Sequence, residues 1–302
     1  MPDQLTKILL DTDIDILGDI DDALCLAYLL RQPECELVGI TTVSYDTQAR
    51  AMVASAMCKA AGKQVPILPG AATPLLQPLP EVTGGDTSDE APALRHWPHE
   101  QDFPLGQAVE FMRRTIHDNP GEIILLAVGP FTNIALLFAV DPEVPVLLRG
   151  LVLMGGLFGR YDRAEWNARF DPHATAIIYR APVRVHRSIG LDVTEAIRLD
   201  EAGVRARLAL NGSEPLRDWL EVWFRHRPSI TFHDPLAAAS IFDEGFCRFD
   251  AGSVEVEVID PEQIGRTRWR PGGGGRHQVA LGVDQERFLR HYFGVLREAG
   301  DR

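Results

Sequence analysis

The sequence predicts an α/β fold: one domain over residues 1–302, with a mostly parallel, Rossmann-like central sheet flanked by helices. Short apolar runs alternate with helical stretches at the spacing of βαβ units. Polar or glycine-rich breaks follow these runs, and no internal repeat or clear linker divides the chain. In such folds ligands bind at the carboxyl ends of the strands, so we expect the active site there.

The elements are expected in alternating order. Residues 7–10 (KILL) form the first buried strand and lead into a burst of acids, and residues 22–30 form a helix that Asp19 or Asp21 can cap. The other strands are short aliphatic runs, at residues 36–43, 65–68, 122–128, 150–154, 183–189 and 278–283. The other helices are expected at residues 47–61, 107–117, 132–138, 174–179, 235–242 and 285–296.

Two stretches lack this periodicity. Residues 70–104 are rich in proline, glycine and acids, and a long irregular loop in a compact domain is typically a functional lid or a mobile segment. Residues 270–276 (RPGGGGR) predict a second flexible loop. We expect both loops to cover part of the site.

Composition excludes several classes of protein. The 302 residues are 45% hydrophobic, which argues against disorder, and the net charge of −13 disfavours nucleic acid and anionic membranes as partners. No apolar stretch reaches the ~18 residues that cross a bilayer, and the first residues do not resemble a signal peptide. The four cysteines include no C-x-x-C pair, which predicts free, mostly buried thiols and a reducing, cytoplasmic location.

The strongest chemical signal is an acidic cluster after the first strand. Residues 11–22 (DTDIDILGDIDD) hold six aspartates. Carboxylates packed this closely repel one another, and a hard divalent cation relieves that repulsion. A solvated acidic turn with helix caps also explains aspartates, but it would not need six of them directly after a buried strand.

Two other metal chemistries fit this stretch less well. In an EF-hand loop, Asp11, Asp13, Asp15 and Asp22 would fall at positions 1, 3, 5 and 12, but Ile16 occupies the position that needs glycine. A phosphohydrolase of the haloacid-dehalogenase type needs a lysine downstream of its D-x-D. The three lysines of this chain all lie within its first 63 residues, which argues against that class.

Five blocks in order identify a resemblance. Residues 10–24 resemble the D-T-D-P-G-x-D-D-A-L signature of the calcium-dependent nucleoside hydrolases, the inosine–uridine-preferring type. The other blocks are residues 126–135 (LAVGPFTNIA), VLMGG at 152–156 with AEWN at 164–167 and Asp171-Pro172, GLDVT at 190–194, and FHDPL at 232–236. Together the blocks extend over roughly residues 7–296.

The resemblance implies hydrolysis of the N-glycosidic bond of ribonucleosides, in purine or pyrimidine nucleoside catabolism, through an oxocarbenium-like transition state. By resemblance, Asp13 is the general base and a Ca²⁺ ligand, and the other ligands are Asp22, Asp234 and the carbonyl of Val128. Asp21, Glu165 and Asn167 would bind the ribose. His233 would contact or protonate the leaving base. Family members are usually dimers or tetramers, so a homo-oligomer is implied.

The chain departs from the family pattern in several places. Seven residues separate Asp13 from Asp21 where the family has three, so Asp15 or Asp19 could be the base instead. The family's G-N after the second strand reads Tyr45-Asp46, and Thr83 stands where the family often has a histidine near the base. Thr83 cannot carry a proton at neutral pH, which leaves the leaving-group acid and the nucleobase preference open.

A further departure lies at the ribose end. A family sugar-contacting asparagine falls on Gly159, next to Arg160, which is either a surface residue or a contact for an anionic group. These departures keep a second class of function open. The chain could be a catalytically weak, calcium-dependent protein that binds nucleosides or ribose.

Overall fold

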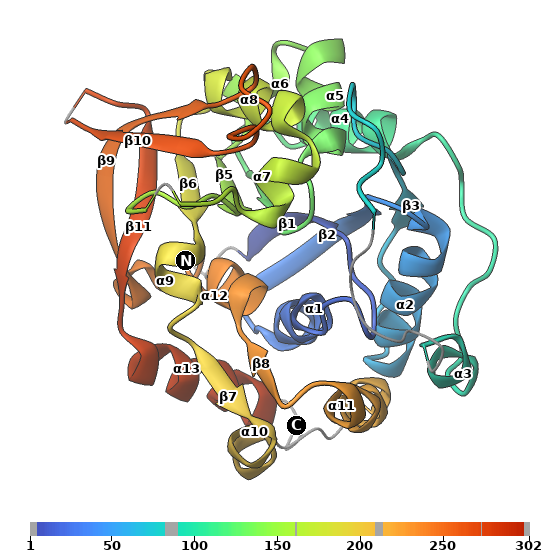
Figure 1. Cartoon of the computed structure of the whole chain (residues 1–302). Helices are drawn as coiled ribbons and strands as arrows, with labels where there is room; N and C mark the ends of the chain where they lie inside the picture. The colour runs from blue at the N-terminus through green and yellow to red at the C-terminus, as the bar shows by residue number, and fades with distance from the viewer. Residues whose placement is uncertain (1–4, 82–89, 161, 209–213, 273, 299–302) are drawn as a thin grey trace.

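The computed structural model describes residues 5–81, 90–160, 162–208, 214–272 and 274–298, and nine strands of this part form one sheet (Figure 1). The strand order is β10-β9-β11-β6-β5-β4-β1-β2-β3. Strand β9 pairs antiparallel with both β10 and β11, and every other pair is parallel. The strands are β1 (Thr6–Thr12), β2 (Cys35–Thr42), β3 (Ile67–Pro69), β4 (Ile123–Ala127), β5 (Gly150–Met154), β6 (His186–Ile189), β9 (Cys247–Val256), β10 (Thr267–Pro271) and β11 (His277–Val283).

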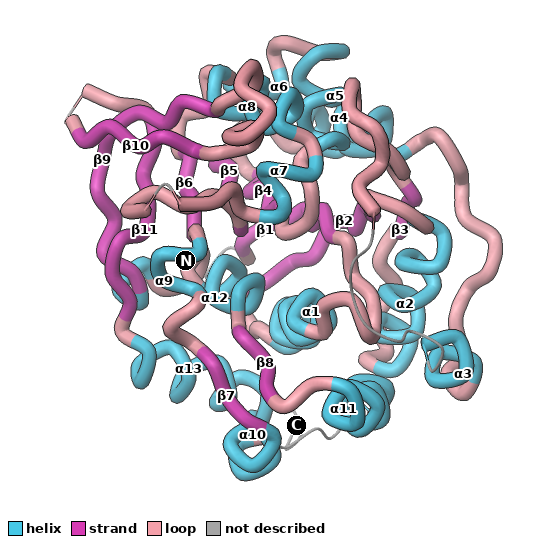
Figure 2. The backbone as a smooth tube through the Cα atoms, in the orientation of Figure 1, coloured by secondary structure: helices cyan, strands magenta, loops and turns pink. Residues whose placement is uncertain are grey.

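Helices cover both faces of this sheet (Figure 2). They are α1 (Asp21–Arg31), α2 (Thr47–Ala60), α3 (Glu90–Arg95), α4 (Ala108–Asp118), α5 (Thr132–Val140), α6 (Val144–Leu147), α7 (Trp166–Phe170), α8 (Pro172–Arg180), α9 (Leu191–Thr194), α10 (Glu201–Arg207), α11 (Glu214–His226), α12 (His233–Ala239), the 3₁₀ helix η1 (Glu244–Phe246) and α13 (Gln285–Glu298). Strands β7 (Arg198–Asp200) and β8 (Ser229–Thr231) form a separate antiparallel pair.

Strand β1 shows how the two faces are filled. Its side chains alternate between faces, so Ile8 and Leu10 join the core formed with α1, α2, α11, α12 and α13. Leu9 joins the second core, formed with α4, α5, α6 and α8. Because both faces of the strand are buried, its sequence is a continuous aliphatic run rather than an alternating one. The predicted α/β fold with a mostly parallel sheet is confirmed.

Several predicted boundaries were wrong. The strand expected at residues 65–68 begins at Ile67, because Pro66 has no N–H to donate to the sheet. The strand expected at 183–189 begins only at His186, after a turn closed by a bond from Val183 N to Ala181 O. The helix expected at 235–242 is α12, residues His233–Ala239, so it begins two residues early and ends three early.

The two stretches expected to be irregular contain regular structure. Helix α3 (Glu90–Arg95) lies within residues 70–104. Strand β10 continues through Pro271, so the loop predicted at 270–276 begins only after that residue. After β10, Gly275 N donates to Gly272 O over 3.0 Å, and Gly273 lies outside the described residues.

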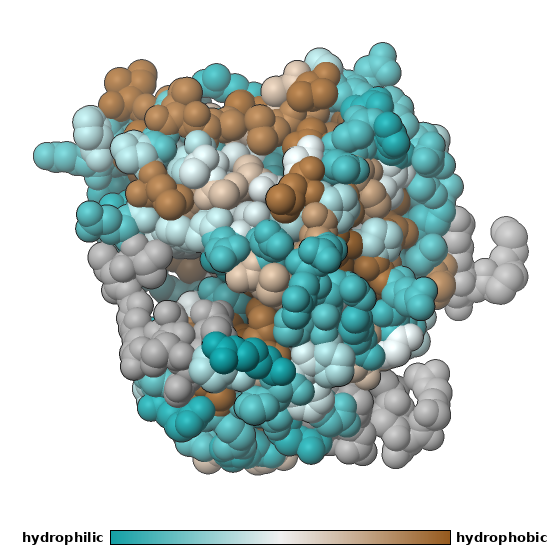
Figure 3. Space-filling model, turned by 90° about the vertical axis from the view of Figure 1, so that its right-hand side faces the viewer, coloured by the Kyte–Doolittle hydropathy of each residue, from teal (hydrophilic) through white to brown (hydrophobic). Residues whose placement is uncertain are grey.

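The cysteines and the surface of the molecule can be compared with the predictions from the sequence. All four cysteines are free; Cys25, Cys58 and Cys247 are buried and Cys35 is half-buried, as predicted. None of the described helices has both the length and the apolar character needed to cross a membrane. On the face shown in Figure 3, hydrophobic side chains gather along the upper part and hydrophilic ones predominate below.

Candidate active site

The carboxyl ends of β1 and β4 bring Asp13 against the segment that follows β4. The two strands are parallel neighbours, with Asp11 opposite Ala127, and Val128 N donates to Asp11 O over 2.8 Å. A Cβ atom on Gly129 would lie 2.7 Å from Asp13 N and 2.8 Å from Asp13 Oδ1. Only glycine therefore lets the two segments approach this closely, and Gly129 helps to fix the position of the half-buried Asp13.

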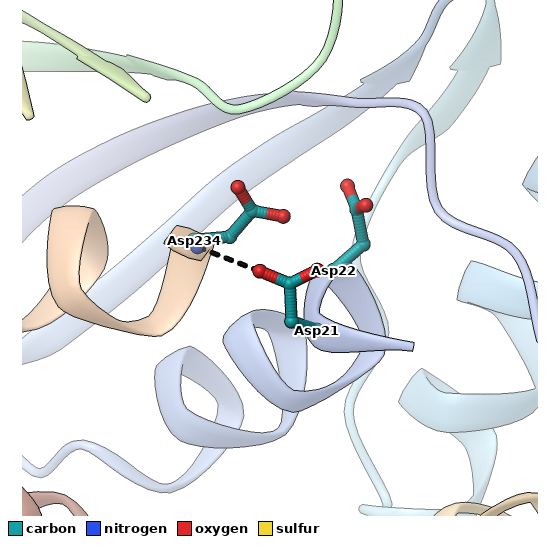
Figure 4. A group of neighbouring side chains, drawn as sticks. All are labelled: Asp21, Asp22 and Asp234. Atoms are coloured by element: carbon teal, nitrogen blue, oxygen red, sulfur yellow. Dashed lines mark hydrogen bonds between the residues drawn. The ribbon is translucent and has the colours of Figure 1, made fainter. Parts of the chain in front are cut away.

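Three buried carboxylates meet beside this point (Figure 4). Asp21 and Asp22 occupy the first turn of α1, Asp234 occupies the first turn of α12, and one oxygen from each lies within 4.8 Å of the others. Helix α12 begins after Phe232, which offers no side-chain acceptor for the free N–H groups of the first turn. Asp21 supplies one from another helix: its Oδ2 accepts from Asp234 N over 2.9 Å.

The electrostatics of this trio favour a cation. Burial raises the pKa of Asp22 well above its usual range, and the charge of Asp13 adds to the effect. Burial likewise raises the pKa of Asp234, followed by the charges of Asp21 and Asp22. Three buried, mutually repelling carboxylates with oxygen atoms this close fit a hard metal ion such as Ca²⁺ or Mg²⁺. We call Asp21, Asp22 and Asp234 the carboxylate trio.

The trio overlaps the predicted ligand set but is not identical to it. It contains Asp22 and Asp234, as expected, and adds Asp21, which the resemblance assigned to the ribose. Asp13 is not one of the three carboxylates that come within this distance of one another. Asp13 is near enough for its charge to raise the pKa of Asp22, and Thr12, the residue before Asp13, donates its hydroxyl to Asp22.

The inserted residues form a loop that Asp15 closes on itself. Its Oδ1 accepts from Gly18 N over 2.7 Å and from Asp19 N over 2.9 Å. Its Oδ2 lies 3.3 Å from the Arg50 guanidinium, which comes from α2. Asp19 is exposed and is hydrogen-bonded to Asp21. Of the three possible bases, Asp13 alone lies directly at the end of a sheet strand.

Glu165 and Asn167 bind backbone groups. Glu165 is the N-cap of α7, and its carboxylate accepts hydrogen bonds from the backbone N–H groups of Gly156, Asn167 and Ala168. Asn167 Nδ2 donates to Val128 O over 2.6 Å and to Met154 O over 3.1 Å. This amide thus ties the ends of β4 and β5 together, and its Oδ1 stays available as an acceptor.

His233 is held from α9. Its Nδ1 lies 2.7 Å from Thr194 Oγ1, and the ring is half-buried. Burial lowers the pKa of His233, while the nearby Asp19 carboxylate opposes that shift. The neutral ring can therefore donate or accept at Nε2 near neutral pH.

Comparison with known proteins assigns this arrangement to a family. The family model described as inosine-uridine preferring nucleoside hydrolase matches residues 8–290. The chain belongs to this family. The non-specific ribonucleoside hydrolase RihC of Salmonella newport is 31% identical over 293 residues, which cover 93% of this chain and 94% of that protein.

Solved structures agree with this nucleoside hydrolase assignment. The purine-preferring ribonucleoside hydrolase from Gardnerella vaginalis has a TM-score of 0.82 and 25% identity, with 98% of this chain and 100% of that chain covered. The plant nucleoside hydrolase PpNRh1 shares the fold at a TM-score of 0.79 and 22% identity, with 97% and 98% covered. The chain is therefore an enzyme of the nucleoside hydrolase family, and the resemblance stated from its motifs is confirmed.

Two buried polar residues of this nucleoside hydrolase, Asp11 and Asn133, were not predicted to have a role. Asp11 is fully buried, and its Oδ1 accepts from the Thr41 hydroxyl and from Asn133 Nδ2. Burial raises the pKa of Asp11 to about 7. Both Asp11 and Asn133 lie inside the matched motif blocks, which was the available signal, but a motif does not say which of its residues touch substrate and which hold the fold.

The turn after β2 explains one departure from the family. Ser44 and Tyr45 have φ values of 67° and 50°, a left-handed conformation that costs roughly 1–2 kcal/mol for a residue with a side chain. Backbone hydrogen bonds to Ala71 O and Ala72 O hold this turn, so Tyr45 can replace the family's glycine.

Two other departures lie elsewhere in the chain. Arg160 is exposed and pairs with Glu195 over 2.8 Å. Thr83 lies outside the described residues.

Proposed function

We propose that this enzyme hydrolyses the N-glycosidic bond of ribonucleosides, releasing ribose and a free nucleobase, with a bound Ca²⁺ as cofactor. The carboxylate trio carries this proposal, because its three buried carboxylates place oxygens close enough together to hold a cation between the first turns of α1 and α12. The RihC proteins, named non-specific ribonucleoside hydrolases, support the substrate class. The nucleobase is left unspecified.

Asp13 acts as the general base in this proposal. Burial raises its pKa, while the Arg50 charge opposes the rise, so its ionised form remains accessible near neutral pH. Its backbone is held by β1 and by the close approach of Gly129. This rigid backbone would keep the Asp13 carboxylate within hydrogen-bond distance of the attacking water.

Asp22, Asp234, the Val128 carbonyl and Asp13 would hold the cation, with Asp21 adjoining them. When bound, Ca²⁺ would supply positive charge that orients water and ribose hydroxyls and lowers the pKa of that water. The chain's own carboxylates then face the ring on which positive charge develops in the oxocarbenium-like transition state.

Asp21, Glu165 and Asn167 would bind the ribose hydroxyls. Asn167 Nδ2 is already used by two backbone carbonyls, so it would accept through Oδ1. Glu165 Oε1 accepts one backbone bond and keeps a lone pair for a hydroxyl. His233, oriented by Thr194, would donate to the leaving nucleobase through Nε2.

Two broader features belong to the same proposal. Four free cysteines support a reducing, cytoplasmic location. A homo-oligomer, dimer or tetramer, rests on the family resemblance alone.

The test is release of free base from a panel of purine and pyrimidine ribonucleosides, with added Ca²⁺ and after chelation. We expect release that requires Ca²⁺ and returns when Ca²⁺ is restored. Calcium-dependent binding of ribose or nucleoside without base release, measured by calorimetry, would instead favour the binding protein. Release that survives complete chelation would exclude the metal-dependent mechanism.

A further inference from the structure

Arg50 connects two irregular segments beside the acidic site. It projects from α2, and its side chain is only 11% exposed. One nitrogen, Nε, donates to Ser44 O over 3.0 Å, within the left-handed turn after β2. Another, Nη1, donates to Asp15 Oδ2 over 3.3 Å, within the loop inserted after β1. A single guanidinium therefore binds both segments.

The Asp15 end of this contact controls the shape of the inserted loop. While Oδ2 faces Arg50, Oδ1 accepts the backbone N–H groups of Gly18 and Asp19. A Cβ atom on Gly18 would overlap the Asp15 carboxylate, so the loop is closed tightly around this side chain. Without Arg50, the half-buried Asp15 carboxylate, two residues from Asp13, would lose this cationic partner.

We propose that Arg50 is a positioning residue of the active site: it holds Asp15 away from the cation-binding carboxylates and thereby fixes the loop that begins at Asp13. The longer first loop of this chain places an additional carboxylate, that of Asp15, near the site. The ion pair with Arg50 keeps Asp15 from binding the metal in place of the other carboxylates. Asp15 is accordingly absent from the carboxylate trio. This inference rests on the proposed function in one point only, the role of Asp13 as the general base.

The first test compares Arg50→Gln, Arg50→Lys and Asp15→Asn with Arg248→Gln, a control that removes an exposed ion pair to Asp250. We expect Arg50→Gln to lower kcat about 10- to 100-fold at saturating substrate and Ca²⁺, with a smaller change in KM. Calorimetry should show Ca²⁺ affinity unchanged or tighter, because a positive charge has been removed. Lysine should restore part of kcat, since it can reach only one of the two acceptors.

Coupling between the two residues gives a sharper result. If Arg50 acts through Asp15, the double variant Arg50→Gln/Asp15→Asn should lose no more kcat than the worse single variant. Additive losses would contradict the proposal. A kcat of Arg50→Gln equal to that of the wild type would also contradict the proposal, whether or not the melting temperature changed. The same holds if added Ca²⁺ restored the kcat that Arg50→Gln had lost.

A second readout does not depend on catalysis. Hydrogen exchange of the Gly18 and Asp19 amides, which Asp15 protects, should be at least tenfold faster in Arg50→Gln and unchanged in Arg248→Gln. Unchanged exchange would overturn the proposal even if activity fell. If the wild-type enzyme released no base, the proposed function would fail, and the exchange and calorimetric results would still decide the role of Arg50.

Discussion

At the scale of single residues, the carboxylates of the site divide into separate tasks. Asp21, Asp22 and Asp234 bring their carboxylate oxygens together, Asp21 also accepts from Asp234 N at the start of α12, and Asp15 closes a loop beside Arg50. Asp13 is the one whose position depends on a strand end and a glycine contact. Identical side chains thus act differently because their hydrogen-bond partners differ.

Removing Asp13 or Asp234 tests the proposed base and the proposed cation ligands together. We expect Asp13→Ala and Asp234→Ala each to abolish turnover while the protein stays folded. Both variants should weaken Ca²⁺ binding by calorimetry, Asp234→Ala at least tenfold because it removes a member of the carboxylate trio. Circular dichroism controls for folding, and normal base release by either variant would refute the assignment of the site.

Gly129 provides a second test at this scale. Gly129→Ala should lower kcat at least tenfold, because its Cβ would lie 2.7 Å from Asp13 N and would displace that residue. Gly294→Ala is the matched control: no atom lies within 4 Å of its Cβ, and alanine is favoured in the α13 helix. Steady-state kinetics of the two variants should therefore diverge, and equal kcat values would show that the contact at Gly129 is not restrictive.

At the scale of elements, Asn133 at the start of α5 connects three segments. Its Nδ2 donates to Asp11 Oδ1 over 2.7 Å and to Thr42 O over 3.0 Å, and its Oδ1 accepts from Ala71 N over 2.8 Å. The ends of β1 and β2 and the chain after β3 are therefore fixed together by one buried amide. One of its partners, Asp11, lies two residues before Asp13.

Asn133→Ala should lower the free energy of unfolding by about 2–4 kcal/mol, because several buried polar groups lose their partner at a typical cost of about 1–3 kcal/mol each. Urea denaturation measures this change. Asn119→Ala, at the half-buried C-cap of α4, should cost less and serves as the comparison. A loss below 1 kcal/mol for Asn133→Ala would mean that water replaces the amide readily.

How far the sequence predicts these elements depends on how local their causes are. The strands at residues 7–10 and 150–154 were found because aliphatic runs with glycine or acid endings are local signals. The pair β7 and β8 and the antiparallel strands β9 and β10 were not predicted. Strands β7 and β8 have three residues each, too few for a recognisable period. Strand β9 pairs with the nearby β10, and the alternation Val254-Glu255-Val256 was an available signal that was not used.

In the site, likewise, sequence motifs identified residues but not the distant groups that those residues bind. Motif blocks located Asp21, Asp22 and Asp234, although Asp234 N and its acceptor on Asp21 are 213 residues apart in sequence. Motifs could not show that Asp21 caps α12 or that Glu165 caps α7, because these roles depend on which backbone N–H groups the fold leaves unpaired. Arg50 was missed for a similar reason: its partners Ser44 and Asp15 lie in two different loops.

At the scale of the whole molecule, the sheet contains a pair of buried histidines, His186 and His277. His186 on β6 faces its register partner His277 on β11, with ring centroids 4.8 Å apart, and stacks on Tyr179 at 4.9 Å. His277 Nδ1 accepts from Val254 N over 2.9 Å. His186 is 1% exposed, and neither ring nitrogen has a hydrogen-bond partner among the described residues.

This pair should make the enzyme sensitive to acid. Burial, followed by the charge of His277, lowers the pKa of His186 to about 3, whereas an unfolded histidine titrates near 6.5. Between these values the unfolded chain binds the extra proton, so the free energy of unfolding falls as the pH drops below about 6.5, by about 2 kcal/mol between pH 7 and pH 5. The buried aspartates, whose pKa values are raised, act in the opposite direction, so wild-type stability alone cannot isolate the histidine.

The variant His186→Phe isolates it, because phenylalanine keeps the stacking on Tyr179 and removes the titrating group without leaving a buried hydrogen bond broken. The difference in free energy of unfolding between this variant and the wild type, measured in urea, should move in the variant's favour by about 2 kcal/mol from pH 7 to pH 5. The aspartate contribution cancels in that difference, since both proteins contain the same acidic site. A difference that stays constant with pH would mean that the folded protein protonates His186 as easily as the unfolded chain does.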